Sequence, residues 1–435
     1  MPIGKLLFNM SLPMMISMLV QALYNIVDSI FVAKLSENAL TAVSLAFPLQ
    51  TLLIAVATGT GVGMNALLSR SLGEHKFKEA NKIGVNAAFL YFLSYLVFLI
   101  LGFTVVKPFY ASQIKGADAE IMEMGIEYLR TVMIFSFGLL AQIYFERLLT
   151  STGKTLFSMT SQLCGALTNI ILDPIMIFVL GWGAAGAATA TVIGNVCTDI
   201  FFVWFLIKKS KNLSVDPRGF HISRSEIGAV FAIGIPASVT NLMQSIGIAL
   251  TNRALLGFGD DKVAAMGIVM KINMIAALVL VGFAFGGQPL TGYNYGARNR
   301  TRLKATLKFA YLLEGGMALV LMAVLGFFAP QMVKIFMSDP SVVENGALML
   351  RLQLAGMLCM GIVLISTCTF QSAGQAMGAF LLSVSRQGVV FAVVLMIALK
   401  VAGYYGVLAS QAISDFLTAV LAVVLVWRWW KKVDF

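Results

Sequence analysis

The chain has 435 residues, of which 59% are hydrophobic and only 12% charged, and its formal net charge is +11. A soluble domain has about 25% charged residues, so this composition excludes a soluble protein and is typical of an integral membrane protein. The positive charge does not indicate nucleic-acid binding, because the basic residues stand in short clusters between apolar runs and form no aromatic-interleaved stripe.

Twelve apolar runs are long enough to cross a bilayer, which takes about 20 residues in a helix. Because lipid offers the backbone no hydrogen-bond partner, each run is expected to be helical. Several runs are longer than one crossing needs, which predicts tilted or kinked helices. The runs are 6–33, 39–70, 84–106, 121–148, 155–180, 184–207, 226–256, 262–292, 304–330, 343–370, 377–401 and 405–428.

The connections between the runs alternate in charge. Those after even-numbered runs are rich in Lys and Arg, whereas those after odd-numbered runs hold acids such as Glu37 and Asp339. The positive-inside rule then predicts a multi-pass protein of the inner (plasma) membrane with both termini in the cytoplasm. The longest connection, residues 208–225, is predicted to be a cytoplasmic linker between two six-helix lobes, an N-lobe (1–207) and a C-lobe (226–435).

An internal repeat supports the two lobes. A shift of 223 residues aligns the first and second halves without a gap for about 60 residues. Two lobes with the same membrane orientation, facing a cavity near the midplane, are a common plan for transporters that work by alternating access. The shift places Pro13 on Pro236, Gln21 on Gln244, Gly59 on Gly282 and Gly63 on Gly286. A separate match later in the chain pairs Gly183 with Gly403.

The first run contains the segment QALYNIVDSIFVAK, in which a carboxylate, Asp28, stands among apolar residues. A charge at the centre of a bilayer costs about 2.5–3.5 kcal/mol on insertion scales, so intramembrane acids face a cavity or a partner. At 100° per residue Asp28 lies on a polar helix face, and Pro13 allows the helix to bend. This face comprises Ser17, Gln21, Tyr24, Asn25 and Asp28.

The fifth and sixth runs carry further polar residues at helical spacing. Asn169 and Asp173 are four residues apart, so they share a face, and Pro174 directly follows the acid. A proline there frees backbone carbonyls beside the carboxylate and predicts a second bend. The sixth run is rich in small residues that permit close helix packing, and its Thr191 and Asn195 are also four apart.

One oxygen-lined site could be formed by the carboxylates of Asp28 and Asp173 together with an amide and a hydroxyl from the fifth and sixth runs. Oxygen ligands suit a hard cation such as Na⁺. Alternatively, a desolvated pair of carboxylates carries a proton, or both aspartates accept structural hydrogen bonds at helix bends. The repeat places Thr251 opposite Asp28 and Val394 opposite Asp173, so an ion site of this kind is predicted in the N-lobe alone.

No pattern indicates an enzyme, and no cofactor is expected. The GTGVG segment lies inside an apolar run without a preceding strand, and STGKT lacks the leading glycine of a phosphate loop. The four cysteines include no CxxC pair, and the two histidines lie in connections. Structural hydrogen bonding is the favoured interpretation of Asp199 and Asp415, while Arg253 and Lys271 stay unassigned.

Five segments together resemble the multidrug and toxic compound extrusion (MATE) transporters, and the resemblance covers nearly the whole chain. Among the family's branches, the sequence is similar to the DinF-like and MepA-like bacterial proteins. The segments are the LP-then-Q-then-YNIVDSIFVAKL pattern of the first run, the GxG-rich end of the second leading to SRSLGE, NIILDPIMIF in the fifth, GAAGAATAT in the sixth, and GIPASVTNLMQ opening the second half.

The resemblance implies an all-α fold of twelve transmembrane helices in two pseudo-symmetric lobes that enclose a V-shaped cleft. It implies cation-driven efflux of amphipathic, often cationic, drugs. It also implies an N-lobe site in which the coupling Na⁺ or H⁺ is bound by residues that match Asp28, Asn169, Asp173 and Thr191 in this sequence.

We therefore predict a monomeric antiporter whose partners are the bilayer and amphipathic organic molecules. The alternative is a flippase for a lipid-linked saccharide or another amphiphile, which several arginines in the cleft would favour; Arg253 and Lys271 leave that question open. The residues distinguish neither Na⁺ from H⁺ nor one physiological substrate from another. Substrate contacts are predicted at Gln21, Tyr24, Asn25, Asn195 and Gln244, and bends at Pro13 and Pro174.

Overall fold

A computed structural model describes residues 2–113, 119–209 and 223–433, and every regular element in them is a helix. The first half of the chain forms α1 (Ile3–Leu35), α2 (Glu37–Gly73), α3 (Phe77–Thr104), α4 (Val106–Gln113), α5 (Ala119–Ile134), α6 (Phe137–Ser151), α7 (Thr155–Pro174) and α8 (Gly183–Lys209). The second half forms α9 (Arg224–Leu255), α10 (Asp260–Gly296), α11 (Arg300–Phe327), α12 (Ala329–Lys334), α13 (Pro340–Leu354), α14 (Met357–Ser372), α15 (Ala376–Gln387) and α16 (Val389–Lys432).

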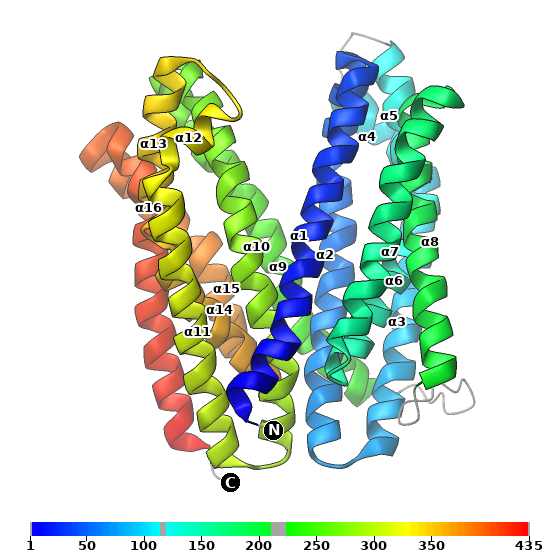
Figure 1. The fold of residues 1–435 in the computed structure, drawn as a ribbon, viewed down its shortest axis with the longest axis vertical. Helices are drawn as coiled ribbons and strands as arrows, with labels where there is room; N and C mark the ends of the chain where they lie inside the picture. The colour runs from blue at the N-terminus through cyan, green and yellow to red at the C-terminus, as the bar shows by residue number, and fades with distance from the viewer. Residues whose placement is uncertain (1, 114–118, 210–222, 434–435) are drawn as a thin grey trace. The chain divides into compact units, whose positions relative to one another are not determined.

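The helices pack into two compact units (Figure 1). The N-unit contains Ile16–Ser71 and Lys76–Gly234, and the C-unit contains Met1–Met15, Leu72–His75 and Ile235–Phe435. The packing thus exchanges short pieces between the two halves of the sequence. Most of the expected linker, residues 210–222, lies outside the described part, so the predicted lobe boundaries stay predictions.

The helix bounds repeat with the shift found in the sequence. α10 and α11 begin and end 223 positions after α2 and α3, as their bounds show. Gly183 and Gly403 also adopt the same unusual backbone, with φ of +55° and +54°, in the left-handed region that favours glycine. The two halves therefore share backbone conformation as well as helix length.

The described helices account for the twelve predicted spans. Nine are long and apolar enough to cross a membrane, and two bent pairs, α5 with α6 (44°) and α13 with α14 (41°), each form one span. One of the nine, Ala376–Lys432, has 57 residues and is broken by non-helical backbone at Gly403. Because that is more than twice the length of one crossing, it provides two spans. The predicted all-α membrane fold is confirmed.

Within the N-unit, the first turns of α9 cross α2 at glycines. A Cβ atom on Gly63 would clash with the backbone carbonyl of Val230. A Cβ atom on Gly234 would lie 2.6 Å from the carbonyl oxygen of Gly59. Glycine is therefore required at this crossing because the two backbones touch.

The C-unit contains the repeat-related crossing, in which the first turns of α1 pack on α10. Added Cβ atoms on Gly282 and Gly286 would lie 2.7 Å from Met15 Cα and 2.5 Å from Ser11 Cα. The Ser11 hydroxyl donates to the Phe283 carbonyl oxygen at 3.0 Å. Since α1 and α9 each begin in one unit and continue in the other, these two helices connect the units covalently.

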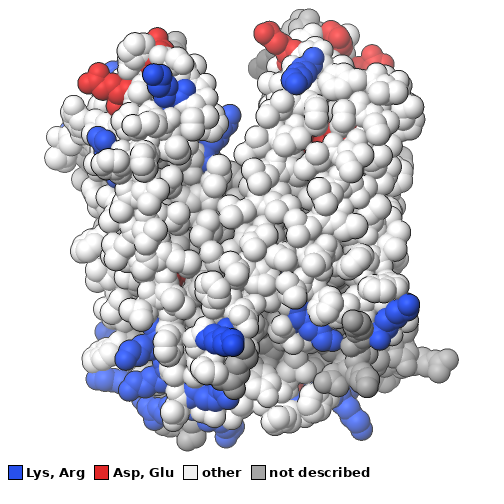
Figure 2. Space-filling model, viewed as in Figure 1, with Lys and Arg blue, Asp and Glu red and all other residues white. Residues whose placement is uncertain are grey.

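Charged side chains separate toward opposite ends of each unit (Figure 2). Lys and Arg gather at the end that holds the α2–α3 and α10–α11 turns, and acids gather at the other end. At the acidic end, Asn38 donates to Glu120 at 2.8 Å and Ser341 to Asp261 at 3.3 Å. This distribution is the positive-inside pattern expected from the sequence.

Gly63→Ala is expected to lower the apparent melting temperature of the purified protein by several degrees, because overpacking a tight contact costs about 1–3 kcal/mol. Gly316→Ala is the matched control, since nothing lies within 4 Å of a Cβ atom at Gly316 inside α11. Thermal unfolding in detergent compares the two variants. If both melted like the parent protein, α2 and α9 would not be in backbone contact.

Candidate functional site

The polar residues of the fifth and sixth runs meet where α7 and α8 cross in the N-unit. Gly165 and Gly194 form the crossing, and a Cβ atom on Gly194 would lie 2.8 Å from the Gly165 carbonyl oxygen and 3.1 Å from Asn169 Cβ. Because the two backbones touch, side chains about one turn away on each helix come into contact. This proximity brings Asn169 of α7 to Thr191 of α8.

Asn169 links two other predicted site residues. Its Nδ2 donates to Thr191 Oγ1 at 3.2 Å and to Asp173 Oδ1 at 3.3 Å. The Thr191 hydroxyl donates in turn to the Ala187 carbonyl at 3.1 Å, which leaves its lone pairs to accept from Asn169. Asn169 and Asp173 are almost completely buried, with exposed fractions of 2% and 0%. The structure therefore places three of the four predicted ion-coupling residues in one hydrogen-bonded network.

Asp28 of α1 lies close enough to this network for its charge to interact with that of Asp173. Tyr24, which hydrogen-bonds Gln21, lies near both acids. Three oxygens of the site are buried and have no hydrogen-bond partner among the described residues, namely Asp28 Oδ1, Asn169 Oδ1 and Asp173 Oδ2. Buried polar atoms are normally satisfied, so three such acceptors in one unit call for a functional explanation.

The two predicted bends differ in form. Pro13 lies inside α1, which continues as one helix on both sides of it. At Pro174, by contrast, α7 ends and a π-helical turn, Ile175–Val179, follows. Proline also removes the amide that would bind the carbonyl of Ile170. Asp173 thus stands at a helix irregularity of the kind that is frequent at functional sites.

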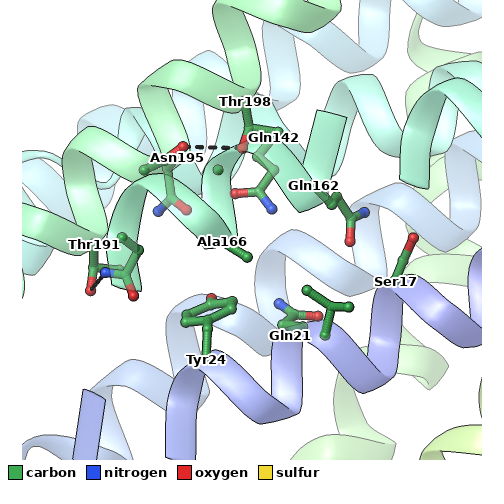
Figure 3. A pocket seen from close by; sticks show the side chains of 13 residues that line it. Ser17, Gln21, Tyr24, Gln142, Gln162, Ala166, Thr191, Asn195 and Thr198 are labelled. Atoms are coloured by element: carbon green, nitrogen blue, oxygen red, sulfur yellow. Dashed lines mark hydrogen bonds between the residues drawn. The ribbon is translucent and has the colours of Figure 1, made fainter. Parts of the chain in front are cut away.

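A small polar pocket lies beside the network within the N-unit, and apart from the space that opens to the surroundings it has room for about one water molecule (Figure 3). Side chains of α1 form one wall, and side chains of α6, α7 and α8 face them. No acidic or basic side chain lines the pocket, whose polar surface consists of amides and hydroxyls. These are Ser17, Gln21, Tyr24, Gln142, Gln162, Asn169, Thr191, Asn195 and Thr198.

The predicted substrate contacts divide into two groups. Gln21, Tyr24 and Asn195 line the pocket, in agreement with their helical spacing. Asn25 does not line it and is exposed, because it is rotated by about 100° from Tyr24 around α1. Gln244, the repeat counterpart of Gln21, belongs to the C-unit and lies outside this pocket.

Ser17 was expected on the polar face of the first run, but the other three polar lining residues outside the predicted site were not anticipated. Gln162 lies seven residues before Asn169, so its position on the polar face of α7 could have been read from the spacing. Thr198 follows Asn195 by three residues on α8. Gln142 carried no such signal, because it is a single amide in the apolar α6 and reaches the pocket through the packing of α6.

The remaining intramembrane charges lie in other environments. Asp415 accepts from Arg386 Nε at 2.9 Å and from Gln411 at 3.0 Å, a hydrogen-bonded arrangement of the kind expected for it. Glu314 of α11 is buried with both oxygens lacking a partner in the described chain, and Asp199 has one such oxygen. Arg253 and Lys271 are both exposed side chains.

Repeated units of membrane-spanning helices, with buried carboxylates beside a polar pocket in one unit, define a membrane transporter. The predicted resemblance can be tested directly against known proteins. The chain belongs to the MatE family, whose model matches residues 13–175 and 236–397, one segment in each half.

Similar proteins span nearly the full chain. The multidrug export protein MepA of Staphylococcus aureus (strain NCTC 8325 / PS 47) is 29% identical over 429 residues, which cover 98% of this chain and 94% of MepA. MepA of Staphylococcus haemolyticus is 28% identical over 428 residues, which cover 98% of this chain and 93% of that protein.

Two solved structures share the fold. An outward-facing multidrug resistance MATE family transporter of the MOP superfamily has a TM-score of 0.94 at 27% identity, covering 100% of this chain and 98% of its own. A Pyrococcus furiosus MOP superfamily transporter described by the reverse polarity of its binding pocket has a TM-score of 0.91 at 28% identity, covering 99% and 96%. The relatives are transporters, and the predicted family is confirmed.

Thr191→Val is expected to lower the apparent melting temperature, because it removes the hydroxyl that accepts from Asn169 and leaves a buried donor at a cost of about 1–3 kcal/mol. Thr189→Val is the matched control, since the Thr189 hydroxyl donates to the Ala185 carbonyl of its own helix. Thermal unfolding in detergent checks the difference. Equal losses in both variants would contradict the cross-helix bond.

Proposed function

We propose that this protein is a secondary active exporter that exchanges Na⁺ or H⁺ for amphipathic, often cationic, organic molecules by alternating access. The observation that carries the proposal is the set of unpartnered buried oxygens from Asp28, Asn169 and Asp173 beside a polar pocket in the same unit. The family and the multidrug export relatives support the transport of small organic compounds across the cell membrane.

The coupling site consists of Asp28, Asn169, Asp173 and Thr191. Two carboxylates in a membrane-spanning unit repel each other and lack solvation, so a bound cation stabilises both. The carboxylate and amide oxygens that lack partners are the ligand type that a hard cation prefers. A proton on one carboxylate would relieve the same repulsion, so the arrangement supports either coupling ion.

The substrate site is the adjacent pocket. Its amides and hydroxyls can donate to and accept from many different ligands, while apolar surfaces nearby accommodate the apolar part of an amphiphile. Asn169 and Thr191 belong to both the pocket and the coupling network. We infer that the coupling ion and the substrate compete, since each changes the hydrogen bonds available to the other.

The orientation follows from the charges. In this proposal the basic ends of both units face the cytoplasm, which is what the positive-inside rule predicts from the charges, and both termini lie on that side. Inward movement of the coupling ion and outward movement of substrate then correspond to export. Pro13 and the break at Pro174 are the proposed points at which α1 and α7 adjust between states.

A flippase for a lipid-linked saccharide or similar amphiphile is the second candidate. The observation in its favour is the exposed Arg253 and Lys271 in the α9 and α10 segments, since cations in spans need an anionic or aqueous partner. A lipid-linked diphosphate would require these cations, whereas a cationic drug would not. Transport that survives Lys271→Gln but not Asp28→Asn supports the exporter.

Asp28→Asn and Asp173→Asn are each expected to reduce gradient-driven dye efflux from proteoliposomes to the level of protein-free vesicles, because each removes one of the two charges that the coupling ion neutralises. Glu123→Gln, an exposed acid in the same unit, is the control and should transport like the parent protein. If Asp28→Asn retained ion-driven efflux, the assignment of the coupling site would fail.

The coupling ion is identified by imposing one gradient at a time. Vesicles with an inward sodium gradient at equal pH are compared with sodium-free vesicles that carry a pH gradient of matched driving force. Efflux under the sodium gradient alone identifies Na⁺ as the coupling ion, and efflux under the pH gradient alone identifies H⁺. Efflux that ignores both gradients would contradict secondary active transport.

A further inference from the structure

The C-unit carries a dense basic surface where α11 begins and α16 ends (Figure 2). Eight exposed Lys and Arg side chains stand on these helix ends, and residues 293–310 and 421–433 contain no Asp or Glu. The short piece Leu72–His75, which packs on this unit, adds one acid, Glu74. The basic surface comprises Arg298, Arg300, Arg302, Lys304, Lys308, Arg428, Lys431 and Lys432.

A cluster of aromatic side chains lies beside these cations and joins several helices. The ring of Trp429, which is buried, lies 6.0 Å from those of Tyr295 and Phe370, between centroids. Trp430 packs against Trp429, also at 6.0 Å. The aromatic cluster therefore packs the ends of α10, α14 and α16 together. This packing restricts the positions of the neighbouring Lys and Arg side chains more than a flexible tail would.

Two cation–π contacts fix the outer charges. The guanidinium carbon of Arg300 lies 5.6 Å from the centroid of the Trp430 ring, which links α11 to α16. Lys431 Nζ lies 3.6 Å from the centroid of Trp427, whose side chain is exposed. Indole rings concentrate at membrane–water interfaces. The cations are thus placed at the depth of lipid headgroups.

The repeat-related surface of the N-unit shares the cation–π contact at the end of α8, where Lys208 Nζ lies 5.4 Å from the centroid of the Trp204 ring, but it differs where α3 begins. The 223-residue shift places Phe77 opposite Arg300 and Glu79 opposite Arg302. Lys76 Nζ there pairs with Glu79 at 3.7 Å. The two surfaces therefore differ at the first turns of α3 and α11, because Glu79 offsets the charge of Lys76 in the N-unit and no acid stands in the first turn of α11.

We propose that the basic surface binds the phosphate headgroup of an anionic diacyl phospholipid, such as phosphatidylglycerol. Arginine forks suit phosphate oxygens, and clusters of about four to eight Lys and Arg beside a membrane-spanning helix attract anionic lipids. The exposed Val423, Val424 and Trp427 of α16 provide an apolar face for the acyl chains. The lipid would stabilise the junction of α11 and α16.

The test uses the full-length protein in neutral detergent. Phosphatidylglycerol or phosphatidylcholine is titrated while thermal unfolding is followed, and retained lipids are identified by native mass spectrometry. The double variant Arg300→Gln/Arg302→Gln is expected to bind phosphatidylglycerol at least about tenfold more weakly, because each cation near the surface contributes to the attraction. Lys78→Gln/Lys82→Gln, which removes two exposed charges from the N-unit surface, should bind like the parent protein.

Three outcomes would overturn the proposal. Phosphatidylglycerol binding could weaken equally in both double variants, or phosphatidylcholine could raise the melting temperature as much as phosphatidylglycerol does. Soluble glycerol phosphate could also give equal stabilisation, which would indicate a site for free phosphate compounds. If Arg300→Gln/Arg302→Gln did not fold, Lys431→Gln/Lys432→Gln tests the same surface from α16. Arg300→Lys/Arg302→Lys should retain part of the selectivity, since it keeps the charge and loses the fork.

Discussion

The structure depends on one constraint, the cost of leaving a polar atom without a partner inside a membrane. It makes every described span a helix, because a helix satisfies its own backbone. It also decides where the helices touch, since glycines such as Gly63 and Gly194 let backbones meet and leave no room for water. Where polar side chains are nevertheless buried, as at Asn169 and Asp173, the same constraint demands hydrogen bonds, and most of these are found.

The two halves respond to this constraint differently although their helices share bounds. Thr251, the repeat counterpart of Asp28, is satisfied by the Gly247 carbonyl of its own helix at 2.9 Å. Asp415 of the C-unit is satisfied by Arg386 and Gln411. In the N-unit, by contrast, Asp28 and Asp173 keep oxygens without protein partners. The repeat positions of the coupling residues thus differ between the halves, although Glu314 of the C-unit is also a buried acid whose oxygens have no partner among the described residues.

Helical spacing and run length predicted much of this from the sequence. The twelve spans, the repeat and the shared face of Asn169 and Asp173 all follow from periodicities of one helix or from self-similarity. The distance between Asn169 and Thr191 does not, because it depends on how Gly165 and Gly194 meet between helices. Gln142 could not be predicted for the same reason. Asn25 shares the polar face of α1 but not the wall of this pocket, because the face is wider than the wall, and its contact with substrate stays a prediction.

In the proposed antiport, the physical basis of coupling is the side chain that the coupling network and the pocket share. Asn169 has one amide group, and its Nδ2 is engaged by Asp173 and Thr191. A substrate that accepts from this amide must weaken its bond to Asp173, and a cation bound by Asp173 must draw the amide oxygen toward itself. Both ligands therefore act on the same side chain in opposite directions. In the exchange that we propose, this buried amide between the charged cluster and the neutral pocket links the two ligands directly, without a signal carried across the molecule.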